Sequence, residues 1–460
     1  MVIGVDIRTL MDARYSGVSE YTLNLVSALL MLDRENEYRL FYNSARDLSG
    51  RMPKFDYPNV KIVKKSVPNK ILNYFLFKFL NSPKIDKLLD VDPASGRGAS
   101  VFFMPHINFI ALSGKSKSVL TIHDLSFLRY PEFFSARKNF WHKMINVKRL
   151  AHKFDKIIAV SENTKRDVVE LCGVNPDRVK VIYSGIEDIY KPDYGLRITD
   201  YGFDIIRNKS HTFWGGLLNP VPKIDFVDPT AEQVGYSKKV RDKYNLPDKF
   251  TPHLLNTDIR LQGEKQNKFL EGDMKFRPKG AGFILFLGTV EPRKNIIGLI
   301  RAYEILKERN SDLSQYKLVI AGGNGWRSEG IYKVWRESKY KDDIIFLGYI
   351  EKKDKVYLYN LASLFVYPSF YEGFGFPPLE AMASGVPVIT SFSSSLPEIV
   401  GGAGLMVDPY NINDLAIAME KVLTDDDLRD NLIKKGLERV KKFSWEKAGR
   451  EYLSLFKNSV

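Results

Sequence analysis

The feature that most constrains the fold of this chain is an alternation of short apolar runs with amphipathic helical patterns, which starts at the N-terminus and restarts in the second half. This alternation is typical of parallel β-sheets whose strands are connected by covering helices. The strands predicted in the first half are 2–7, 38–43, 60–63, 100–105, 118–124, 156–161 and 179–185. Those predicted in the second half are 283–290, 316–323, 343–350, 363–369, 386–391 and 404–408. We therefore predict an α/β fold with two doubly wound domains in tandem.

Helices are predicted between several of these strands, where apolar residues recur at helical spacing. One covers 19–32, and another covers 161–173, with Ser161 as its N-cap and Gly173 at its end. In the second half, the helices predicted are 295–309, 352–362, 377–384 and an amphipathic tail from 413 onward.

The predicted domains follow from this pattern and from the length, because 460 residues are too many for a single core. We predict an N-terminal Rossmann-like domain over 1–189, a C-terminal Rossmann-like domain over 283–443 and a last helix over 444–460. Residues 190–282 fit neither domain, because their aromatic, Gly and Pro residues show no clear period. A connection of this length is uncommon, so it is either an ordered insertion or a disordered one.

Composition narrows the environment and the partners. The N-terminus lacks a signal-peptide pattern and no apolar run reaches the ~18 residues typical of a membrane span. The single cysteine, Cys172, fits a reducing compartment. The net charge of +14 either favours acidic partners, such as anionic lipid or phosphorylated small molecules, or reflects only a solvated, lysine-rich surface. Nucleic acid is the weakest candidate, because zinc-finger spacing and RNA-binding aromatic signatures are both missing from the sequence.

The most informative stretch is SFYEGFGFPPLEAMASGVPVIT, residues 369–390, in which two glutamates surround a glycine turn. Gly373 and Gly375 permit unusual backbone angles, and the turn leads into a helix whose N-terminus suits an anion such as phosphate. Glu372, before the turn, and Glu380, expected in the first helical turn, share the sign of that anion, so we expect them to accept hydrogen bonds from hydroxyl groups. A nucleotide sugar has the matching order of groups, with hydroxyls on either side of its phosphates. The alternative is a surface turn with two solvated glutamates.

A pair of cations occurs near the same edge of the predicted second sheet. In FILFLGTVEPRKN, Arg293 and Lys294 follow a strand and precede a helix. Ligands of open α/β sheets bind outside the C-terminal ends of the strands, where these cations are expected. They would hold two phosphates and stabilise the charge of a departing diphosphate. Taken alone, the pair would be an ordinary solvated one.

Together, GTVEPRKN, FLGYI and LFVYPSFYEGFGFPPLEAMASGVPVI resemble the retaining glycosyltransferases of family 4, the group 1 glycosyl transferases. The resemblance covers most of 1–188 and 283–460. It implies the GT-B architecture, in which two Rossmann-like domains face a central cleft. It further implies that the C-terminal domain binds a sugar nucleotide, that the acceptor binds the N-terminal domain, and that the last helix crosses back to the N-terminal domain.

The resemblance implies a role for each matching residue. Glu380 would bind the ribose and Glu372 the hydroxyls of the donor sugar, while Arg293 and Lys294 would hold the diphosphate. The other donor-binding positions implied are Gly17, Gly373, Phe374 and Gly375 beside the phosphates, and Gly348 and Tyr349 at the base.

His123, at the end of the predicted strand 118–124, would by itself more often be a structural histidine. The resemblance places it at the cleft near the donor sugar, so we group it with Glu372, Arg293 and Lys294 as catalytic. His106, at another strand end, is a weaker candidate.

The reaction implied is transfer of a sugar from a nucleoside-diphosphate sugar to an acceptor hydroxyl of a glycan or lipid-linked saccharide, with retention of anomeric configuration. Because the EPRKN-type second half resembles mannosyltransferase-like proteins, GDP-mannose is the first expected donor. The sequence has no Asp-x-Asp pair suited to bridging a metal ion to diphosphate, so no metal or other cofactor is expected. The alternatives are a UDP-hexose-dependent transferase, a sugar-nucleotide epimerase of the same fold and a catalytically inactive nucleotide-sugar-binding protein.

Residues 63–89 mix lysines with Phe, Tyr and Leu. This mixture predicts a helix packed on the first sheet, a segment that lies on an anionic membrane, or both. We therefore expect a cytoplasmic protein, with peripheral contact to the inner face of the plasma membrane as the open question.

Overall fold

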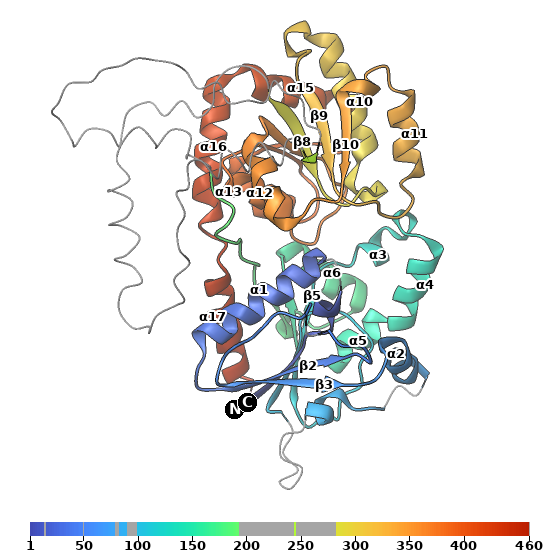
Figure 1. Ribbon diagram of the computed structural model, residues 1–460, viewed down its shortest axis with the longest axis vertical. Helices are drawn as coiled ribbons and strands as arrows, with labels where there is room; N and C mark the ends of the chain where they lie inside the picture. The colour runs from blue at the N-terminus through green and yellow to red at the C-terminus, as the bar shows by residue number, and fades with distance from the viewer. Residues whose placement is uncertain are drawn as a thin grey trace, which may run out of the picture.

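The computed structural model describes residues 1–12, 15–48, 50–78, 82–89, 99–192, 243–244 and 282–459. It contains two β-sheets, one above the other in Figure 1, with the strand orders β3-β2-β1-β4-β5-β6-β7 and β10-β9-β8-β11-β12-β13. The strand pairs within both sheets are parallel. The predicted fold class, two doubly wound Rossmann-like units, is confirmed.

The first sheet is built from the first half of the chain. Its strands are β1 (Val2–Asp6), β2 (Glu37–Asn43), β3 (Val60–Lys65), β4 (Val101–Met104), β5 (Lys117–Ile122), β6 (Lys156–Ala159) and β7 (Val179–Val181). The accompanying α-helices are α1 (Gly17–Leu32), α2 (Asn69–Lys78), α3 (Ser126–Arg129), α4 (Ala136–Ile145), α5 (Val147–Lys153) and α6 (Glu162–Cys172).

The second sheet is built from the second half. Its strands are β8 (Phe283–Leu287), β9 (Lys317–Ala321), β10 (Ile344–Gly348), β11 (Leu364–Tyr367), β12 (Val388–Ser391) and β13 (Leu405–Val407). The helices are α10 (Ile296–Arg309), α11 (Glu329–Glu337), α12 (Lys352–Leu361), α13 (Phe376–Ala383), α14 (Leu396–Val400), α15 (Ile412–Thr424), α16 (Asp426–Val440) and α17 (Trp445–Lys457).

In each sheet, the order in which successive strands are added reverses at a central strand. This switch point locates the edge where ligands bind. The strand β1 lies between β2 and β4, and β8 lies between β9 and β11. In open α/β sheets, the C-terminal ends of the strands around such a switch point form the binding edge. The loops that follow β8 and β11 lie at this edge of the second sheet, and the loop that follows β5, the neighbour of β4, lies at the corresponding edge of the first.

Helices cover both faces of the first sheet. Tyr21 of α1 and Phe456 of α17 belong to one buried cluster, whereas Leu76 of α2, Ala151 of α5 and Val168 of α6 belong to another. Strand residues alternate between the two clusters, as the two-residue period of a strand requires. The inner strands of the sheet are thus buried on both sides, which explains their apolar runs, whereas the edge strand β3 is largely exposed.

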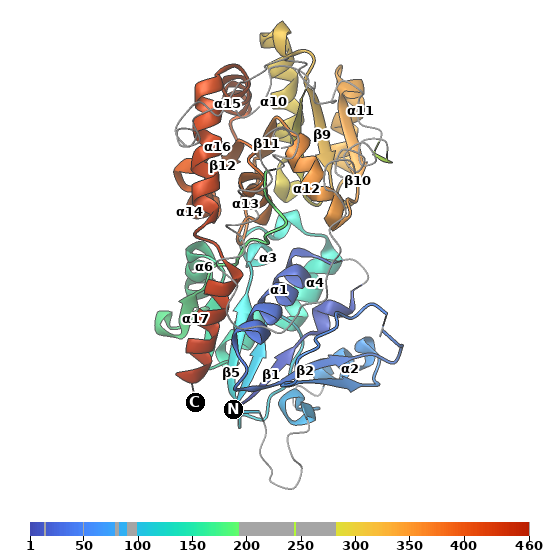
Figure 2. The same ribbon diagram turned by 60° about the vertical axis from the view of Figure 1, so that its left-hand side comes forward.

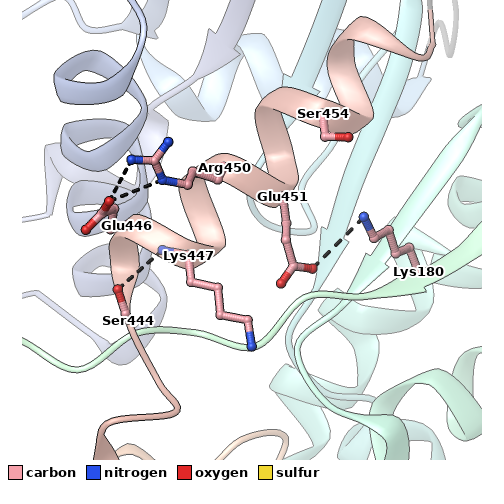
Figure 3. Close-up of a pocket in the computed structure, with 7 residues that line it drawn as sticks. All are labelled: Lys180, Ser444, Glu446, Lys447, Arg450, Glu451 and Ser454. Carbon is pink, nitrogen blue, oxygen red and sulfur yellow. Dashed lines mark hydrogen bonds and ion pairs between the residues drawn. The ribbon is translucent and has the colours of Figure 1, made fainter.

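The helix α17 belongs to the end of the chain but packs on the first half. It lies along α1 below the second sheet, as Figure 2 shows. The hydroxyl of Tyr452 lies 2.7 Å from that of Tyr21 and 2.8 Å from that of Thr121. Figure 3 shows the outer side of this helix, where Glu451 lies 4.0 Å from Lys180 of β7 in a shallow surface pocket. The last helix therefore ties the two halves together.

The predicted strands are all present, but several end earlier than expected. The strand predicted as 118–124 ends at Ile122, and the one predicted as 283–290 ends at Leu287. Of the residues beyond these points, Val290 is buried and the others are half-buried or exposed, and none of them belongs to the regular strand pairing. In both places, the excess length belongs to a loop that carries candidate site residues.

Three helices of the first half, α3, α4 and α5, were missing from the predicted ones. Residues of α4 and α5 lie between β5 and β6, and α4 buries only Ile145. A helix with so little buried surface has no clear apolar stripe, so its period is hard to detect from sequence. The predicted insertion 190–282 lies outside the described residues, apart from its first three residues, 243–244 and Gly282. Among the described helices, none has both the length and the apolar character that a membrane crossing requires.

Candidate functional site

The glycine turn lies between β11 and α13, at the C-terminal edge of the second sheet, and it touches the first half of the chain. A Cβ atom added to Gly373 would lie 1.9 Å from the carbonyl oxygen of His123, so only glycine allows this approach. Gly375 is the N-cap of α13 with φ of 113°, a left-handed value that favours glycine. The two glycines therefore have different tasks: close contact at Gly373 and chain reversal at Gly375.

A run of serines after β12 holds this turn from its own domain. The Ser393 hydroxyl donates to the carbonyl of Ser369 (2.9 Å), and the Ser394 hydroxyl accepts from the backbone N–H of Glu372 (2.8 Å). The Ser395 hydroxyl lies within donating distance of two carbonyls, those of Glu372 (3.0 Å) and Phe374 (2.7 Å). These serines were not predicted as site residues, although the run SSS in the sequence is a signal for a hydrogen-bonding loop.

Glu372 lies at the centre of a buried ionic cluster. Its Oε1 atom lies 2.5 Å from the Nζ atom of Lys294 and 2.6 Å from the Ser369 hydroxyl. Its Oε2 atom lies 3.5 Å from Arg293, which also lies 2.8 Å from Glu291. Lys294 further donates to the Tyr367 hydroxyl at 2.7 Å. The structure therefore brings Arg293, Lys294 and Glu372 together, as ion-pair partners of one another.

The charges of this cluster are set by burial and by the partners. Burial alone would raise the pKa of Glu372, but Lys294 and Arg293 outweigh it and the pKa is lowered. Burial, and after it the charge of Arg293, lowers the pKa of Lys294. The pKa of Arg293 is raised, because Glu372, Glu291 and Asp124 together outweigh its burial. The cluster thus stabilises an ionised Glu372 beside two cations.

The predicted position of Glu380 needs a correction. Because α13 begins at Phe376, Glu380 lies in the second turn of the helix and not in the first. Its side chain is buried and accepts a hydrogen bond from the Tyr359 hydroxyl at 2.8 Å. It also lines a small pocket together with Glu20 and Tyr190 of the first half and Trp445 of the returning helix α17. Glu380 and Glu372 therefore lie in different surroundings.

The pKa of Glu380 is raised, in contrast to that of Glu372. Burial is the largest cause and the nearby Glu20 adds to it, while Lys355 acts in the opposite direction. The Nζ atom of Lys355 lies 3.5 Å from Glu20, so α12 and α1 meet beside this carboxylate. Lys355 was not predicted as a site residue.

On the other side of the turn, His123 and Asp124 follow β5 of the first sheet. The Nε2 atom of His123 lies 2.8 Å from the carbonyl oxygen of Pro105, and the ring packs edge-on against Tyr21 at 4.5 Å. Burial lowers the pKa of His123. Asp124 has a lowered pKa because Arg293, after burial the largest influence, acts against the effect of burial. Histidine and aspartate of the first half thus adjoin the cluster of the second.

The remaining predicted positions lie apart from the ionic cluster. Gly17 is exposed at the start of α1, where the Ser16 hydroxyl caps the helix. Gly348 ends the edge strand β10 with φ of 71°, and Tyr349 after it is 44% exposed. His106 is buried near Asp6, and burial lowers its pKa to about 4. Among the described residues, no group of three His, Cys, Asp or Glu side chains is placed to hold a metal ion.

Comparison with known proteins gives matches in both halves. The family described as "Glycosyl transferases group 1" matches residues 273–439, and "Glycosyltransferase Family 4" matches residues 15–188. O-antigen chain mannosyltransferase B of Escherichia coli is 40% identical over 183 residues, which are 40% of this chain and 48% of that protein. Serotype-specific mannosyltransferase WbdA of Escherichia coli is 29% identical over 334 residues, 72% of this chain and 32% of that protein. The chain thus spans about half or less of the length of these curated relatives.

A solved structure extends the likeness to the whole fold. Alr3699/HepE of Anabaena, solved in complex with UDP and glucose, superposes with a TM-score of 0.60 at 14% identity, over 100% of both chains. The predicted GT-B architecture is therefore confirmed. With one family matching each half of the chain, and with mannosyltransferases among the proteins most similar in sequence, this chain belongs to the group 1 glycosyl transferases of the family 4 type.

Proposed function

We propose that this chain transfers a sugar from a nucleoside-diphosphate sugar, with GDP-mannose as the first candidate, to an acceptor hydroxyl of a glycan or lipid-linked saccharide. The observation that carries the proposal is the Arg293–Lys294–Glu372 cluster at the C-terminal edge of the second sheet, directly beside the end of β5. A buried pair of cations at that edge suits a diphosphate, and the carboxylate between them suits sugar hydroxyls.

The pairing of Glu372 with the cations suggests how the diphosphate is stabilised. Arg293 is held by Glu291 as well as by Glu372, so it keeps its position when a ligand exchanges for one partner. Cations fixed in a buried site stabilise growing negative charge without having to reorganise. In this proposal Arg293 and Lys294 accept the charge of the departing diphosphate.

We propose retention of the anomeric configuration by attack on the same face that the leaving group departs from. A double displacement needs a carboxylate free to act as nucleophile. Glu372 instead accepts from Lys294 and Ser369 at one oxygen and pairs with Arg293 at the other. His123, whose Nε2 atom faces the Pro105 carbonyl, would orient the donor sugar or the acceptor.

We further propose that the reaction needs no metal ion, because the two cations supply the charge that a metal would. Transfer in the presence of a chelator should therefore equal transfer without it. The measurement is the initial rate with and without excess EDTA, and an absolute requirement for Mn²⁺ or Mg²⁺ would exclude this account of the leaving group.

The donor is proposed from the relatives, since two mannosyltransferases are similar to this chain. A UDP-hexose is the second candidate, because Alr3699/HepE was solved with UDP and glucose. Thermal unfolding with GDP, UDP and dTDP separates them, because a nucleotide at 100 times its Kd stabilises by about 2.7 kcal/mol. We expect GDP to raise the melting temperature most. A chain that responds to none of the three nucleotides would contradict the proposal.

Assays of sugar release then separate a transferase from the alternatives of the same fold. A transferase should hydrolyse its sugar nucleotide slowly without acceptor and faster with a saccharide acceptor. An epimerase would convert the sugar nucleotide into its epimer, and an inactive binding protein would leave it unchanged.

We also propose that the first half contacts an anionic membrane through α2 and α4. Both helices contribute buried residues to the same cluster, the one that also contains Ala151 of α5 and Val168 of α6. Their outer sides expose large apolar residues, and exposed basic residues of the same half include Arg137 of α4 and Lys64 of the edge strand β3. The exposed apolar residues are Ile71 (48%), Tyr74 (52%), Phe75 (46%), Phe140 (64%) and Trp141 (40%). Aromatic side chains between basic ones are the pattern of an interfacial membrane contact.

Flotation with liposomes tests this contact. We expect binding to vesicles with anionic lipid at low salt, weaker binding in Tyr74→Ser/Phe75→Ser, and unchanged binding in Ile417→Ser, an equally exposed site on α15. Equal binding by all three proteins, or none by the unmodified chain, would contradict the proposal.

A further inference from the structure

The N-terminus of α6 in the first domain is capped by a carboxylate of the second. Glu398, on the short helix α14, accepts from the backbone N–H of Glu162 at 3.0 Å and from that of Asn163 at 3.2 Å. The third amide of the helix, at Thr164, donates to the hydroxyl of Ser161 at 3.0 Å. The first amides of a helix have no partner within it, and an acidic group there is favoured by the helix dipole. Two of the three bonds at this terminus therefore come from the other domain.

The same end of α6 holds the glycine turn. The Ser161 hydroxyl lies 2.6 Å from the carbonyl oxygen of Gly373, and the Thr164 hydroxyl lies 3.2 Å from it. The Thr164 hydroxyl also lies 3.2 Å from the carbonyl oxygen of His123. This end of α6 thus contacts the backbone of both candidate catalytic loops, the one that follows β5 and the one that precedes α13.

The helix α14 and the residue before it fix both Glu398 and the glycine turn. Ser395, the residue before α14, bonds the carbonyls of Glu372 and Phe374, and Glu398 lies three positions further along. Arg439 of α16 donates to the backbone carbonyls of Glu398 and Ile399, which holds α14 in place. The turn is therefore held by α14 on one side and α6 on the other, and the Glu398 carboxylate links those two supports.

We propose that Glu398 is a positioning residue for transfer: by capping α6 across the domain interface, it keeps Ser161 and Thr164 on the Gly373 carbonyl and so fixes the turn that carries Glu372 against the His123 loop. This inference rests on the proposed transferase function. Glu398 itself lies beside the site and does not take part in it, and its effect passes through α6.

The proposal predicts that loss of the Glu398 cap lowers kcat much more than it changes the affinity for the nucleotide. Apart from Gly17 at the start of α1, the groups expected to bind the diphosphate and the base belong to the second domain, so loss of the cap should leave nucleotide affinity within about twofold. The turn would lose its support from the first domain, and a helix cap contributes on the order of a tenfold effect. We therefore expect Glu398→Ala to lower kcat about tenfold.

The experiment compares Glu398→Ala and Glu398→Gln with the control Glu438→Gln, in the full chain. Glu438 is an exposed glutamate of α16 whose ion pair, to Lys441, stays within its own domain. Glutamine retains one acceptor and should lose less than alanine, and the control should match the unmodified chain. If Glu438→Gln lowers kcat as much as Glu398→Ala, or if Glu398→Ala leaves kcat unchanged, the proposal is wrong.

Hydrogen exchange of the amides of 162–164 gives a readout that does not depend on transfer. We expect faster exchange at these amides in Glu398→Ala, with unchanged exchange in the core strands. Equal protection in both proteins would show that the cap does not form in solution. This measurement also keeps the two proposals apart, because it tests the cap even if no donor is turned over.

A double-mutant cycle tests the route through α6. In a Ser161→Ala/Thr164→Val background, the contact to Gly373 is already lost, so Glu398→Ala should then lower kcat by less than about twofold. Independent, multiplying effects would show that Glu398 acts by some other route.

Discussion

Glu372 and Glu380 are the same residue type, eight positions apart, and both are buried, yet their surroundings are opposite. Glu372 pairs with two cations, and its pKa is lowered. Glu380 accepts from the Tyr359 hydroxyl beside Glu20, and its pKa is raised. The difference arises at Gly375, where the chain reverses before α13, so that one glutamate faces the loop after β8 and the other faces α12 and α1.

This contrast teaches that the two glutamates do not act as a carboxylate pair. Two carboxylates that share a site raise one another's pKa, whereas here each pKa has its own local cause. Glu372 is held ionised as part of a positive cluster. Glu380 lines a pocket made from both halves of the chain, where hydrogen bonding to a ligand is its more natural task.

The largest effect is expected from removing the cation that neutralises Glu372. Lys294→Met leaves the buried Glu372 carboxylate with the Ser369 hydroxyl and the longer contact to Arg293, and removing one partner of a buried pair costs about 3–5 kcal/mol. The melting temperature should fall on the order of 10 °C. The control is Lys353→Met, which removes an exposed pair to Glu351 and should leave the melting temperature nearly unchanged. Similar melting temperatures for the two variants would remove the distinction between the two glutamates.

The next effect separates the glutamates by kinetics. Glu372→Gln weakens the cluster that we propose to stabilise the leaving diphosphate, and it should lower kcat by about 10²–10³. Glu380→Gln removes the charge from a hydrogen-bonding acceptor and should raise the Kd for the nucleotide about tenfold, with a smaller change in kcat. Steady-state kinetics and nucleotide titration measure both, and the reverse assignment of kcat and Kd effects would break the comparison.

Most of the fold follows from the sequence, and the elements of the site follow in part. The inner strands were predictable because a strand buried on both faces is a continuous apolar run, whereas the largely exposed edge strand β3 mixes apolar residues with lysines. Arg293, Lys294 and the glycine turn meet because the strands before them, β8 and β11, are neighbours in the sheet. His123 was predicted as the end of a strand, whereas it lies one residue beyond β5, in the loop.

The partners of the charged groups were not predictable in this way. The sequence suggested cations free to meet a diphosphate and a glutamate free to meet hydroxyls, whereas Lys294 and Glu372 pair with each other. Which side chains pair depends on loop geometry at the scale of one rotamer, and apolar periodicity carries no information on it. The serines after β12 and Glu398 were missed for the same reason, because their targets are backbone atoms of distant loops.

A pH series should show opposite trends for the two glutamates. The pKa of Glu372 is lowered from its ordinary value of 4.5, so its contribution to stability is present above pH 4.5 and is lost as the pH falls. The pKa of Glu380 is raised from 4.5, so its contribution is present below pH 4.5 and is lost as the pH rises through the folded-state value. Melting temperatures of the unmodified chain, Glu372→Gln and Glu380→Gln between about pH 3 and 7 measure this. We expect the melting temperature of the unmodified chain to exceed that of Glu372→Gln by less as the pH falls. We expect it to exceed that of Glu380→Gln by less as the pH rises toward neutral. Parallel curves would mean that the two carboxylates share one environment.

The smallest effect tests whether the hydroxyl of Tyr359 belongs to the Glu380 pocket or only to the core. Tyr359→Phe removes one hydrogen bond to Glu380 and should cost about 1 kcal/mol of stability. Tyr303→Phe is the matched control, because Tyr303 is equally buried in the same domain and donates at 2.8 Å to the carbonyl of Tyr316. Both variants should lose similar stability, since each leaves one buried acceptor without its donor. Only Tyr359→Phe should also weaken nucleotide binding, by about two- to fivefold, because its loss allows the Glu380 carboxylate to turn away from a ligand. Equal nucleotide affinity in the two variants would show that Tyr359 contributes only to the stability of the core and does not orient Glu380 toward a ligand.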